Sequence, residues 1–280
     1  MNLRIILLTS LTMAAFAANS IFCRLALSDH SNDPVSFTIL RLFAGAAILL
    51  PLALKAYHDK KIIVNRVALL PAFMLFSYAL FFSLAYVQMT ASTGALIVFP
   101  AAQMTMLGYS MYNGAKLSRF EKLGVIIALS GLVYLVLPGF DVPPVQASIL
   151  MALSGISWGI YSILGKKAAD PVTATAMNFI FTLPVVLALY LVFGLKLTTM
   201  GATWAVLSGA LTSALGYLLW YIVMQSLKTS TAAVAMLSSP VIAAFGGILL
   251  LNEKTSLRLF IATALILGGL YIKIVANNKA

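Results

Sequence analysis

Arg41 is a charged residue inside an otherwise apolar stretch of the sequence. It lies seven positions after Pro34, which is roughly 10 Å along a helix axis. A guanidinium at that depth in a membrane is costly unless it faces a cavity or a partner. Two interpretations are open. Arg41 extends to the membrane interface or ties neighbouring helices together, or it faces a transport path and attracts a carboxylate or another anionic group.

Polar and aromatic side chains also recur three or four residues apart in two other segments. The first set is Ser154, Ser157, Trp158 and Tyr161, and the second is Ser213, Tyr217, Trp220 and Tyr221. Each set occupies one face of a helix. Hydrogen bonds between packed helices explain such residues as well as a binding site does, although Trp158 lies too deep for an interfacial belt. The candidates for a cavity lining are Asn19, Arg41, Tyr78, Gln103, Ser154, Trp158, Tyr161, Asn178, Tyr217 and Trp220.

The acidic residues and histidines all fall in predicted loops or at helix ends. They are Asp29, Asp33, Asp59, Glu121, Asp141, Asp170, Glu253, His30 and His58. Intramembrane hydrolases and metal sites need such groups in contact at mid-depth. We therefore expect no enzyme activity, no metal site and no cofactor, and an intramembrane enzyme is only a distant alternative. A deep carboxylate that exchanges protons for cationic drugs is equally unexpected.

The composition is that of an integral membrane protein. Hydrophobic residues make up 62% of the chain and charged residues 9%, whereas soluble domains contain about 25% charged residues. The formal charge of +11 would suggest nucleic acid in a soluble protein, but Lys and Arg in short loops set orientation in a membrane protein. The expected partners are a small-molecule substrate and the lipid bilayer, with no nucleic acid, and a monomer is sufficient. Cys23 is the only cysteine, so no internal disulfide can form.

Apolar segments of about 20 residues, the length that crosses a bilayer, predict an all-α integral membrane fold with ten transmembrane helices. The predicted ranges are 4–27, 34–54, 67–89, 91–114, 119–138, 146–165, 171–193, 202–226, 229–251 and 256–275. The first segment imitates a signal peptide, but we expect it to be retained because its apolar run continues to Leu27. Ser118 and Glu121 have capping-box spacing at the start of the fifth helix.

The two halves of the chain look like copies of each other. At an offset of 138, Ser92-Thr93 recurs as Ser230-Thr231, Lys116-Leu117-Ser118 as Lys254-Thr255-Ser256, and Gly131 as Gly269; at 137, the pairs are Pro34 with Pro171, Arg41 with Asn178, and Gln88 with Gln225. The loop at 138–144, rich in Pro, lies at the midpoint. Because five is an odd number, the copies must face opposite ways across the bilayer, as in many transporters. We predict two inverted five-helix repeats, 1–140 and 145–280, around a central cavity.

Positive residues concentrate on one side of this arrangement. With both termini on that side, it holds Arg4, Lys55, Lys60, Lys61, Arg66, Lys116, Arg119, Lys122, Lys166, Lys167, Lys228, Lys273 and Lys279. The other side holds Arg24, Lys196, Lys254 and Arg258. Cytoplasmic loops carry the excess of Lys and Arg. We therefore predict a multi-pass protein of a bacterial-type inner (plasma) membrane with both termini in the cytoplasm.

The sequence resembles the ten-helix EamA-type exporters of the drug/metabolite transporter superfamily over nearly its whole length. The resemblance rests on Pro34–Arg41, Pro100, Pro240, Ser157-Trp158 and Leu251–Lys254. It implies two inverted repeats around a central cavity, with the fifth and tenth helices outside it, and outward movement of small metabolites, often amino acids. Pro100 and Pro240 are then candidate helix breaks. Two positions depart from the family pattern, because Ala115 replaces a frequent acid and Ala17-Ala18 replaces a frequent Trp-Gly.

The leading functional hypothesis is a secondary transporter that exports a small polar or amphipathic metabolite, amino-acid-like above all, by alternating access. Arg41 and the lack of a deep acid favour a neutral, zwitterionic or anionic substrate over a cation. An exporter of drug-like or lipid-linked substrates on the same fold is the first alternative, and a cavity that opens sideways between helices would favour it. A channel would require a continuous pore.

Overall fold

The structure is a computed structural model that describes residues 3–28, 30–59, 66–136, 143–227, 235–254 and 256–277. Within these residues all regular structure is helical. The helices are α1 (Leu3–Leu27), α2 (Pro34–His58), α3 (Arg66–Tyr86), α4 (Ala91–Tyr112), α5 (Arg119–Val136), α6 (Val145–Lys166), α7 (Pro171–Phe193), α8 (Thr199–Leu207), the π-helix η1 (Ser208–Leu215), α9 (Gly216–Ser226), α11 (Ser238–Leu251) and α12 (Leu257–Asn277).

Seven helical spans in the described ranges are long and apolar enough to cross a membrane. They are α1, α2, Leu69–Tyr86 of α3, α4, α6, α7 and the continuous run Thr199–Ser226. α11 and the part of α12 at Leu257–Ile272 are shorter apolar helices. α5 is apolar along most of its length but carries Arg119, Glu121 and Lys122 in its first turn. The chain is thus a multi-pass membrane protein.

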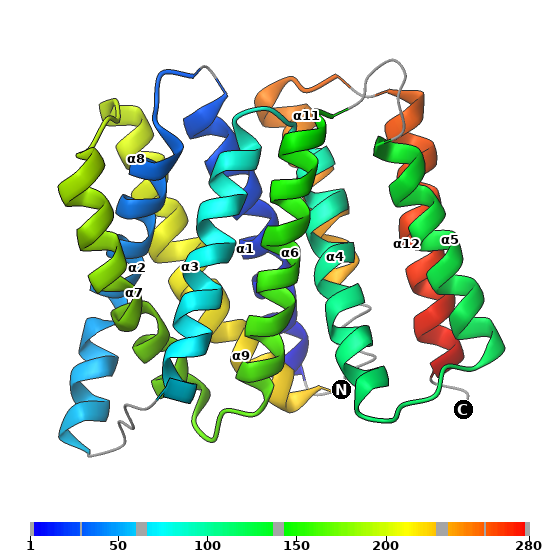
Figure 1. The fold of residues 1–280 in the computed structure, drawn as a ribbon, viewed down its shortest axis with the longest axis horizontal. Coiled ribbons are helices and arrows are strands. Elements are labelled where there is room, and N and C mark those ends of the chain that lie inside the picture. Colours follow the sequence, from blue (N-terminus) through cyan, green and yellow to red (C-terminus); the bar gives the residue numbers. More distant parts are fainter. Residues whose placement is uncertain are drawn as a thin grey trace.

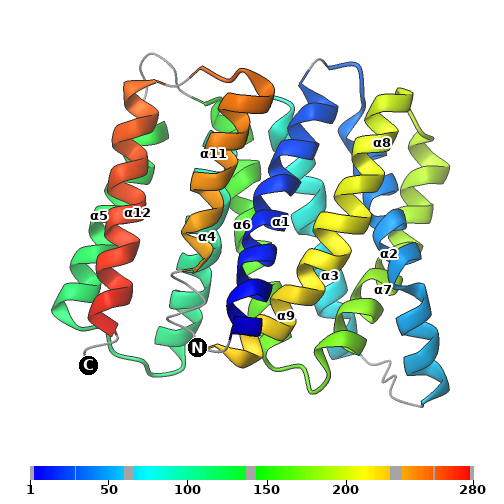
Figure 2. The same ribbon diagram turned by 180° about the vertical axis from the view of Figure 1, so that it is seen from behind.

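The helices run alternately between two ends of the molecule (Figure 1). α1 begins and α12 ends at the same end, which we call the terminal end; the connections from α1 to α2 and from α3 to α4 lie at the opposite, far end. Figure 2 shows α1 between α11 and the run from α8 to α9, and α1 packs against all of them. The buried core of the molecule therefore contains one face of α1 and the faces of the neighbouring helices that contact it.

α5 and α12 form a separate pair at one edge of the bundle (Figures 1 and 2). Glycines let the two helices approach closely. A Cβ on Gly269 would lie 2.4 Å from the backbone N of Ala128, and one on Gly131 would lie 2.7 Å from Cβ of Leu265. This edge position agrees with the expectation that the helices at 119–138 and 256–275 lie outside any central cavity.

Local cap chemistry sets several helix starts. Asp33 accepts hydrogen bonds from Ser36 N–H (2.7 Å) and Ser36 Oγ (2.8 Å), with Pro34 as the first residue of α2. Asp170 caps α7 in the same way, ahead of Pro171. The predicted capping box of α5 is confirmed, because Ser118 N–H donates to Glu121 (2.7 Å) and Glu121 N–H donates to Ser118 Oγ (3.2 Å).

Several predicted boundaries differ from those of the structure. α2 continues to His58 instead of ending at 54. α3 ends at Tyr86 instead of 89, since Thr90 already caps α4 by accepting from Thr93 N–H (3.2 Å). The predicted helix at 202–226 begins at Thr199, because Thr198 accepts from Gly201 N–H at 3.0 Å. Polar residues that cap a helix fall outside the apolar stretch, so hydropathy alone does not locate them.

The two candidate helix breaks behave differently. α4 runs through Pro100 without ending there. α11 begins at Ser238, after a turn at Leu237 and two residues before Pro240. A proline in the first turn of a helix leaves no hydrogen bond unmade, because N–H groups there have no intrahelical partner.

Some sequence predictions lie outside the described residues. They are the helix start at 229–234, the linker at 138–142, the repeat pair member Ser230-Thr231, and the loop charges Asp29, Lys60, Lys61, Asp141, Lys228 and Lys279.

Candidate functional site

Arg41 lies inside the bundle and its side chain is fully buried. Its Nε donates to Ser213 Oγ at 2.9 Å. Its Nη2 donates to the hydroxyl of Tyr217 at 2.7 Å and more weakly to that of Tyr78 at 3.4 Å. The guanidinium therefore ties α2 to α3, η1 and α9, and it does not extend to the membrane interface.

Asn19 on α1 completes a hydrogen-bond network around this arginine. Asn19 Nδ2 donates to the Tyr78 hydroxyl at 3.1 Å. Asn19 Oδ1 accepts from Ser208 Oγ (2.7 Å) and Thr212 Oγ1 (3.1 Å). Together with the bonds of Arg41, these contacts join five helical elements, α1, α2, α3, η1 and α9, through their buried polar groups. We call Asn19, Arg41, Tyr78, Ser208, Thr212, Ser213 and Tyr217 the central network.

The π-helix η1 supplies three hydroxyls of the central network, and glycines bring it close to α2. A Cβ on Gly209 would lie 2.1 Å from the backbone O of Arg41. A Cβ on Gly45 would lie 2.4 Å from the ring of Phe179 on α7. Ser213 can reach Arg41 because the two backbones are in contact at Gly209. Short π-helical segments inside α-helices are frequent at functional sites.

Aromatic rings cover one side of the central network. The Trp158 ring centroid lies 4.6 Å from that of Tyr217, 5.0 Å from Tyr78 and 5.3 Å from Phe16. A small cavity between these rings has a volume of about 10 Å³ and is lined by Phe16, Tyr78, Phe82, Val98, Phe99, Trp158 and Tyr217. That space is at the lower limit for a single water molecule. The site is therefore closed in this conformation.

Several buried polar side-chain atoms in the bundle have no hydrogen-bond partner within the described part of the chain. They are Ser20 Oγ, Arg41 Nη1, Gln103 Nε2, Trp158 Nε1 and Tyr161 OH. Leaving a buried polar group unpaired costs about 1–3 kcal/mol, so each such atom requires an explanation. Four of these residues are cavity candidates predicted from the sequence, namely Arg41, Gln103, Trp158 and Tyr161.

The remaining candidates do not all join the central network. Ser154 Oγ donates to the backbone O of Tyr78 at 3.0 Å and so fixes that residue. Tyr161 stacks on Trp158. Trp220 Nε1 donates to Ser162 Oγ (3.1 Å), and Asn178 Nδ2 donates to the Tyr221 hydroxyl (3.4 Å). These last contacts join α6, α7 and α9 on the terminal-end side of the centre.

The far end is held by a contact that the sequence did not predict. Glu253, after α11, accepts from the backbone N–H of Ala91 at 2.7 Å and from Ser92 Oγ at 3.2 Å, at the first turn of α4. Arg24 Nε lies 3.9 Å from Glu253 Oε1, and Arg24 Nη1 donates to the backbone O of Tyr86 at 3.0 Å. The sequence indicates for Arg24 only a place among the positive residues on the side opposite the termini. Its partners come from distant segments, so only the fold reveals them.

The candidates predicted from the sequence do not include four residues of this region, namely Phe16, Phe82, Ser208 and Thr212. Ser208 and Thr212 precede Ser213 on the same helix, so the polar face could have been extended backwards by one turn. Phe16 and Phe82 carry no such signal, since phenylalanine is common on any buried or lipid-facing helix surface.

Comparison with known proteins places the chain among transporters. A model of the EamA-like transporter family matches residues 146–275. An uncharacterized protein of Pseudomonas aeruginosa is 44% identical over 269 residues, which cover 95% of this chain and 93% of that protein. An uncharacterized transporter of Archaeoglobus fulgidus is 26% identical over 97% of this chain and 98% of its own. The uncharacterized transporter YoaV of Bacillus subtilis is 23% identical over 87% of this chain and 88% of its own.

A solved structure shares the fold. It is described as the crystal structure of a protein, and it superposes with a TM-score of 0.67 over 96% of this chain and 98% of its own, at 20% sequence identity.

Proposed function

The chain belongs to the EamA-type family of the drug/metabolite transporter superfamily, and from that premise we propose that the central network and its aromatic wall are the substrate site of a secondary transporter. The proposal rests mainly on the contact of Arg41 with Tyr78 and Tyr217. These three residues form a buried polar centre in a membrane protein. Buried ionisable groups in membrane proteins mark substrate or ion pathways. The substrate is a small polar or amphipathic metabolite, amino-acid-like compounds included.

The transport cycle is alternating access. The centre is covered toward the far end by the contacts of Glu253 with Ala91 and Arg24, and toward the terminal end by Tyr221, whose hydroxyl donates to the backbone O of Tyr161 at 3.1 Å. A site closed on both sides has to open to one side at a time if it is to carry a solute without forming a channel. The far-end contacts and the α6–α9 contacts are the two regions that would separate.

The architecture behind this cycle is a pair of inverted five-helix repeats, 1–140 and 145–280, with ten transmembrane helices in all. Two observations support it. Asp33-Pro34 and Asp170-Pro171 start α2 and α7 in the same way. Gly131 and Gly269, 138 residues apart, both lie at the contact between α5 and α12. The excess of Lys and Arg on the terminal side supports an inner-membrane protein with cytoplasmic termini. Export as the direction of transport rests on the family resemblance alone.

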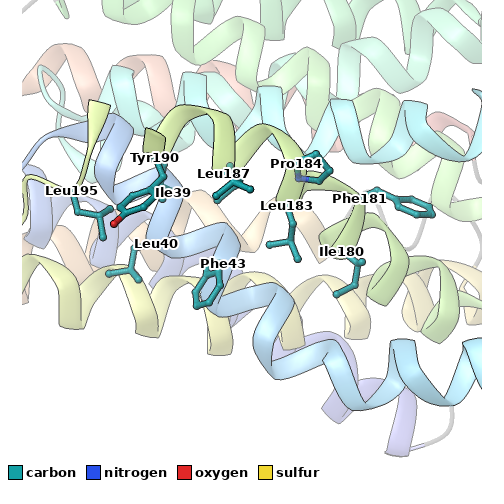
Figure 3. Close-up of a pocket in the computed structure, with 11 residues that line it drawn as sticks. Ile39, Leu40, Phe43, Ile180, Phe181, Leu183, Pro184, Leu187, Tyr190 and Leu195 are labelled. Atoms are coloured by element: carbon teal, nitrogen blue, oxygen red, sulfur yellow. The ribbon is translucent and has the colours of Figure 1, made fainter. Parts of the chain in front are cut away.

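A second candidate, transport of drug-like or lipid-linked substrates, is favoured by a groove on the side of the bundle. The groove has a volume of about 890 Å³, and side chains of α2 and α7, together with Leu195 after α7, line it (Figure 3). The lining is apolar, with Phe43 and Leu187 both more than half exposed. Arg41 on the same helix points instead to η1 and α9. The groove therefore suits a hydrocarbon chain, but the polar centre does not open into it.

The test is an unbiased comparison of metabolites in the medium of cells with and without the protein. A compound whose level depends on the protein is then measured for uptake into proteoliposomes, with protein-free liposomes as the control. Protein-dependent uptake supports the proposal, and absence of uptake of every compound that differs contradicts it. Leu187→Trp fills the groove, and Leu191→Trp serves as its control, because Leu191 is an exposed residue of the same helix that does not line the groove. Loss of uptake only in Leu187→Trp would favour the second candidate.

A further inference from the structure

We propose that Arg41 is the anchor of an anion site that binds the carboxylate of the transported substrate. The inference rests on the proposed function and names the substrate class for the same site. It begins with charge. None of the described carboxylates contacts Arg41: Asp33 and Asp170 cap helices, Glu121 belongs to a capping box, Glu253 binds Ala91, and Asp59 follows the last turn of α2. A buried cation without a counter-anion is strongly destabilising, so the ligand supplies the negative charge.

Hydrogen-bond capacity points to the same ligand. A guanidinium has five N–H donors, and the two on Nη1 of Arg41 have no acceptor in the described residues. Trp158 Nε1, whose ring packs against Tyr78 and Tyr217, is a further buried donor without an acceptor there. The Tyr78 oxygen already accepts from Asn19 and Arg41, and Asn19 Oδ1 already accepts from two hydroxyls. Arg41 Nη1 and Trp158 Nε1 are thus donors without acceptors beside Tyr78 and Tyr217, which matches a carboxylate because that group only accepts.

The geometry of Arg41 allows a two-point contact. The bond from Nη2 to Tyr78 is 3.4 Å long, whereas the bond from Nη2 to Tyr217 is 2.7 Å. The long bond is the weaker of the two. A carboxylate oxygen that replaces Tyr78 on Nη2, with the second oxygen on Nη1, gives the paired arrangement in which arginine binds carboxylates most strongly.

The lining of the small cavity defines the rest of the ligand. Phe16, Phe82, Phe99 and Trp158 surround the space beside Tyr78 and Tyr217. These rings offer apolar surface for the substrate body. Since the cavity holds only about 10 Å³ in the closed state, the substrate enters when the helices separate. The inferred substrate is a small carboxylate with an apolar or aromatic body.

The first test needs no ligand. Arg41→Met removes the charge and keeps an unbranched apolar side chain, while Tyr78 and Tyr217 remain bonded to each other at 3.0 Å. If the charge of Arg41 is uncompensated until an anion binds, the Arg41→Met variant removes a destabilising charge. The purified, ligand-free variant should then have a higher Tm than the wild-type protein in low-salt buffer. A lower Tm would overturn the proposal and assign Arg41 to holding the helices together.

The second test measures anion binding directly. The probes are sodium benzoate, 3-methylbutanoate and propanoate, compared with their primary amides and amines and with sodium chloride at equal ionic strength. We expect at least one carboxylate to raise the Tm of the wild-type protein more than its amide, its amine or chloride does. If chloride raises the Tm as much as the carboxylates do, the site binds anions in general, and the proposal that it recognises a carboxylate is wrong. Absence of stabilisation by all three carboxylates also overturns the proposal.

Substitutions then assign the effect to Arg41. Arg41→Gln should weaken the affinity for the stabilising carboxylate roughly thirtyfold or more, as the loss of a buried, hydrogen-bonded charge pair does. Arg41→Lys keeps the charge but not the fork of donors and should weaken it less. Arg258→Gln is the matched control, because Arg258 donates to the backbone O of Tyr134 at the α5–α12 edge. Unchanged affinity in stable Arg41→Gln protein would overturn the proposal.

The inference and the proposed function can fail separately. Uptake into proteoliposomes that is normal in Arg41→Gln would leave the transporter assignment intact and remove the anion site. Carboxylate binding that depends on Arg41, without uptake of any compound, would support the anion site and contradict the transporter assignment.

Discussion

The hydroxyl oxygens of Tyr78 and Tyr217 lie 3.0 Å apart although 139 residues separate them in the chain. That separation is close to the offsets of 137 and 138 at which residue pairs recur in the sequence. The two tyrosines therefore occupy nearly equivalent positions in the proposed repeats, and both bind Nη2 of Arg41. If the repeats are inverted, their symmetry axis passes close to this contact, where a transporter of this design holds its substrate.

Tyr217→Phe should lower the free energy of unfolding by about 1.5–3 kcal/mol, because it removes a short hydrogen bond to a charged group. The bond is the one from Arg41 Nη2 at 2.7 Å. Unfolding of the purified protein in mixed micelles measures the change. Tyr271→Phe is the control, since Tyr271 is 56% exposed on α12. Equal stability of the two variants would show that the hydroxyl of Tyr217 contributes nothing.

Trp158→Ala and Tyr78→Ala should reduce transport more than they reduce the amount of folded protein. Both rings line the small central cavity, so their loss changes the surface that we propose as the substrate site. Uptake per folded molecule is compared with the Tm of each variant. Trp204→Ala serves as a matched control, because Trp204 stacks on Phe22 away from the centre. Parallel losses of uptake and Tm would mean that Trp158 and Tyr78 act as packing residues.

Gly209→Ala should destabilise the protein by about 1–3 kcal/mol, as overpacking does. The new Cβ would meet the backbone O of Arg41 at 2.1 Å, which cannot move without shifting α2 against η1. Gly108→Ala adds the same methyl group where nothing lies within 4 Å, and it should be neutral or slightly stabilising because alanine favours helix. Chemical unfolding of both variants is the measurement. A Gly209→Ala protein as stable as Gly108→Ala would contradict this close contact.

Glu253→Gln should make the far end open more often. The carboxylate lies at the first turn of α4 and near Arg24, and a negative charge at a helix N-terminus contributes roughly 0.3–1 kcal/mol. Cys23 is a fully buried neighbour of Arg24 and the only cysteine, so its rate of modification by a maleimide reports opening. We expect faster labelling than in the wild-type protein. Glu121→Gln alters a cap on α5 and controls for general loosening; equal acceleration in both would refute the far-end role.

Reporter fusions should place the C-terminus in the cytoplasm. The reason is the concentration of Lys and Arg on the terminal side, since such residues remain on the cytoplasmic side. A fusion after Ala280 is compared with one after Leu195, in the connection between α7 and α8 at the far end. Fluorescence from the first and phosphatase activity from the second are expected. The reverse pattern would contradict the proposed orientation.

The sequence alone was sufficient to predict that the chain is a membrane protein, where most of its helices lie and to which family it belongs. Long apolar runs must become helices in a bilayer, because backbone groups there have no water to bind. This rule is local, so it identified helices such as α1 and α7 to within a few residues. The sequence also indicates that Arg41 is unusual, since a charged residue within an apolar segment can be recognised without a structure.

Tertiary structure decided what Arg41 touches. Ser213 and Tyr217 lie 172 and 176 residues away in the chain, and no periodicity within α2 could select them. The same holds for Glu253, which binds the start of α4 across 162 residues, and for the π-helix that turns three hydroxyls inward. Spacing along one helix tells which residues share a face, but the partner of that face depends on the packing of all the helices.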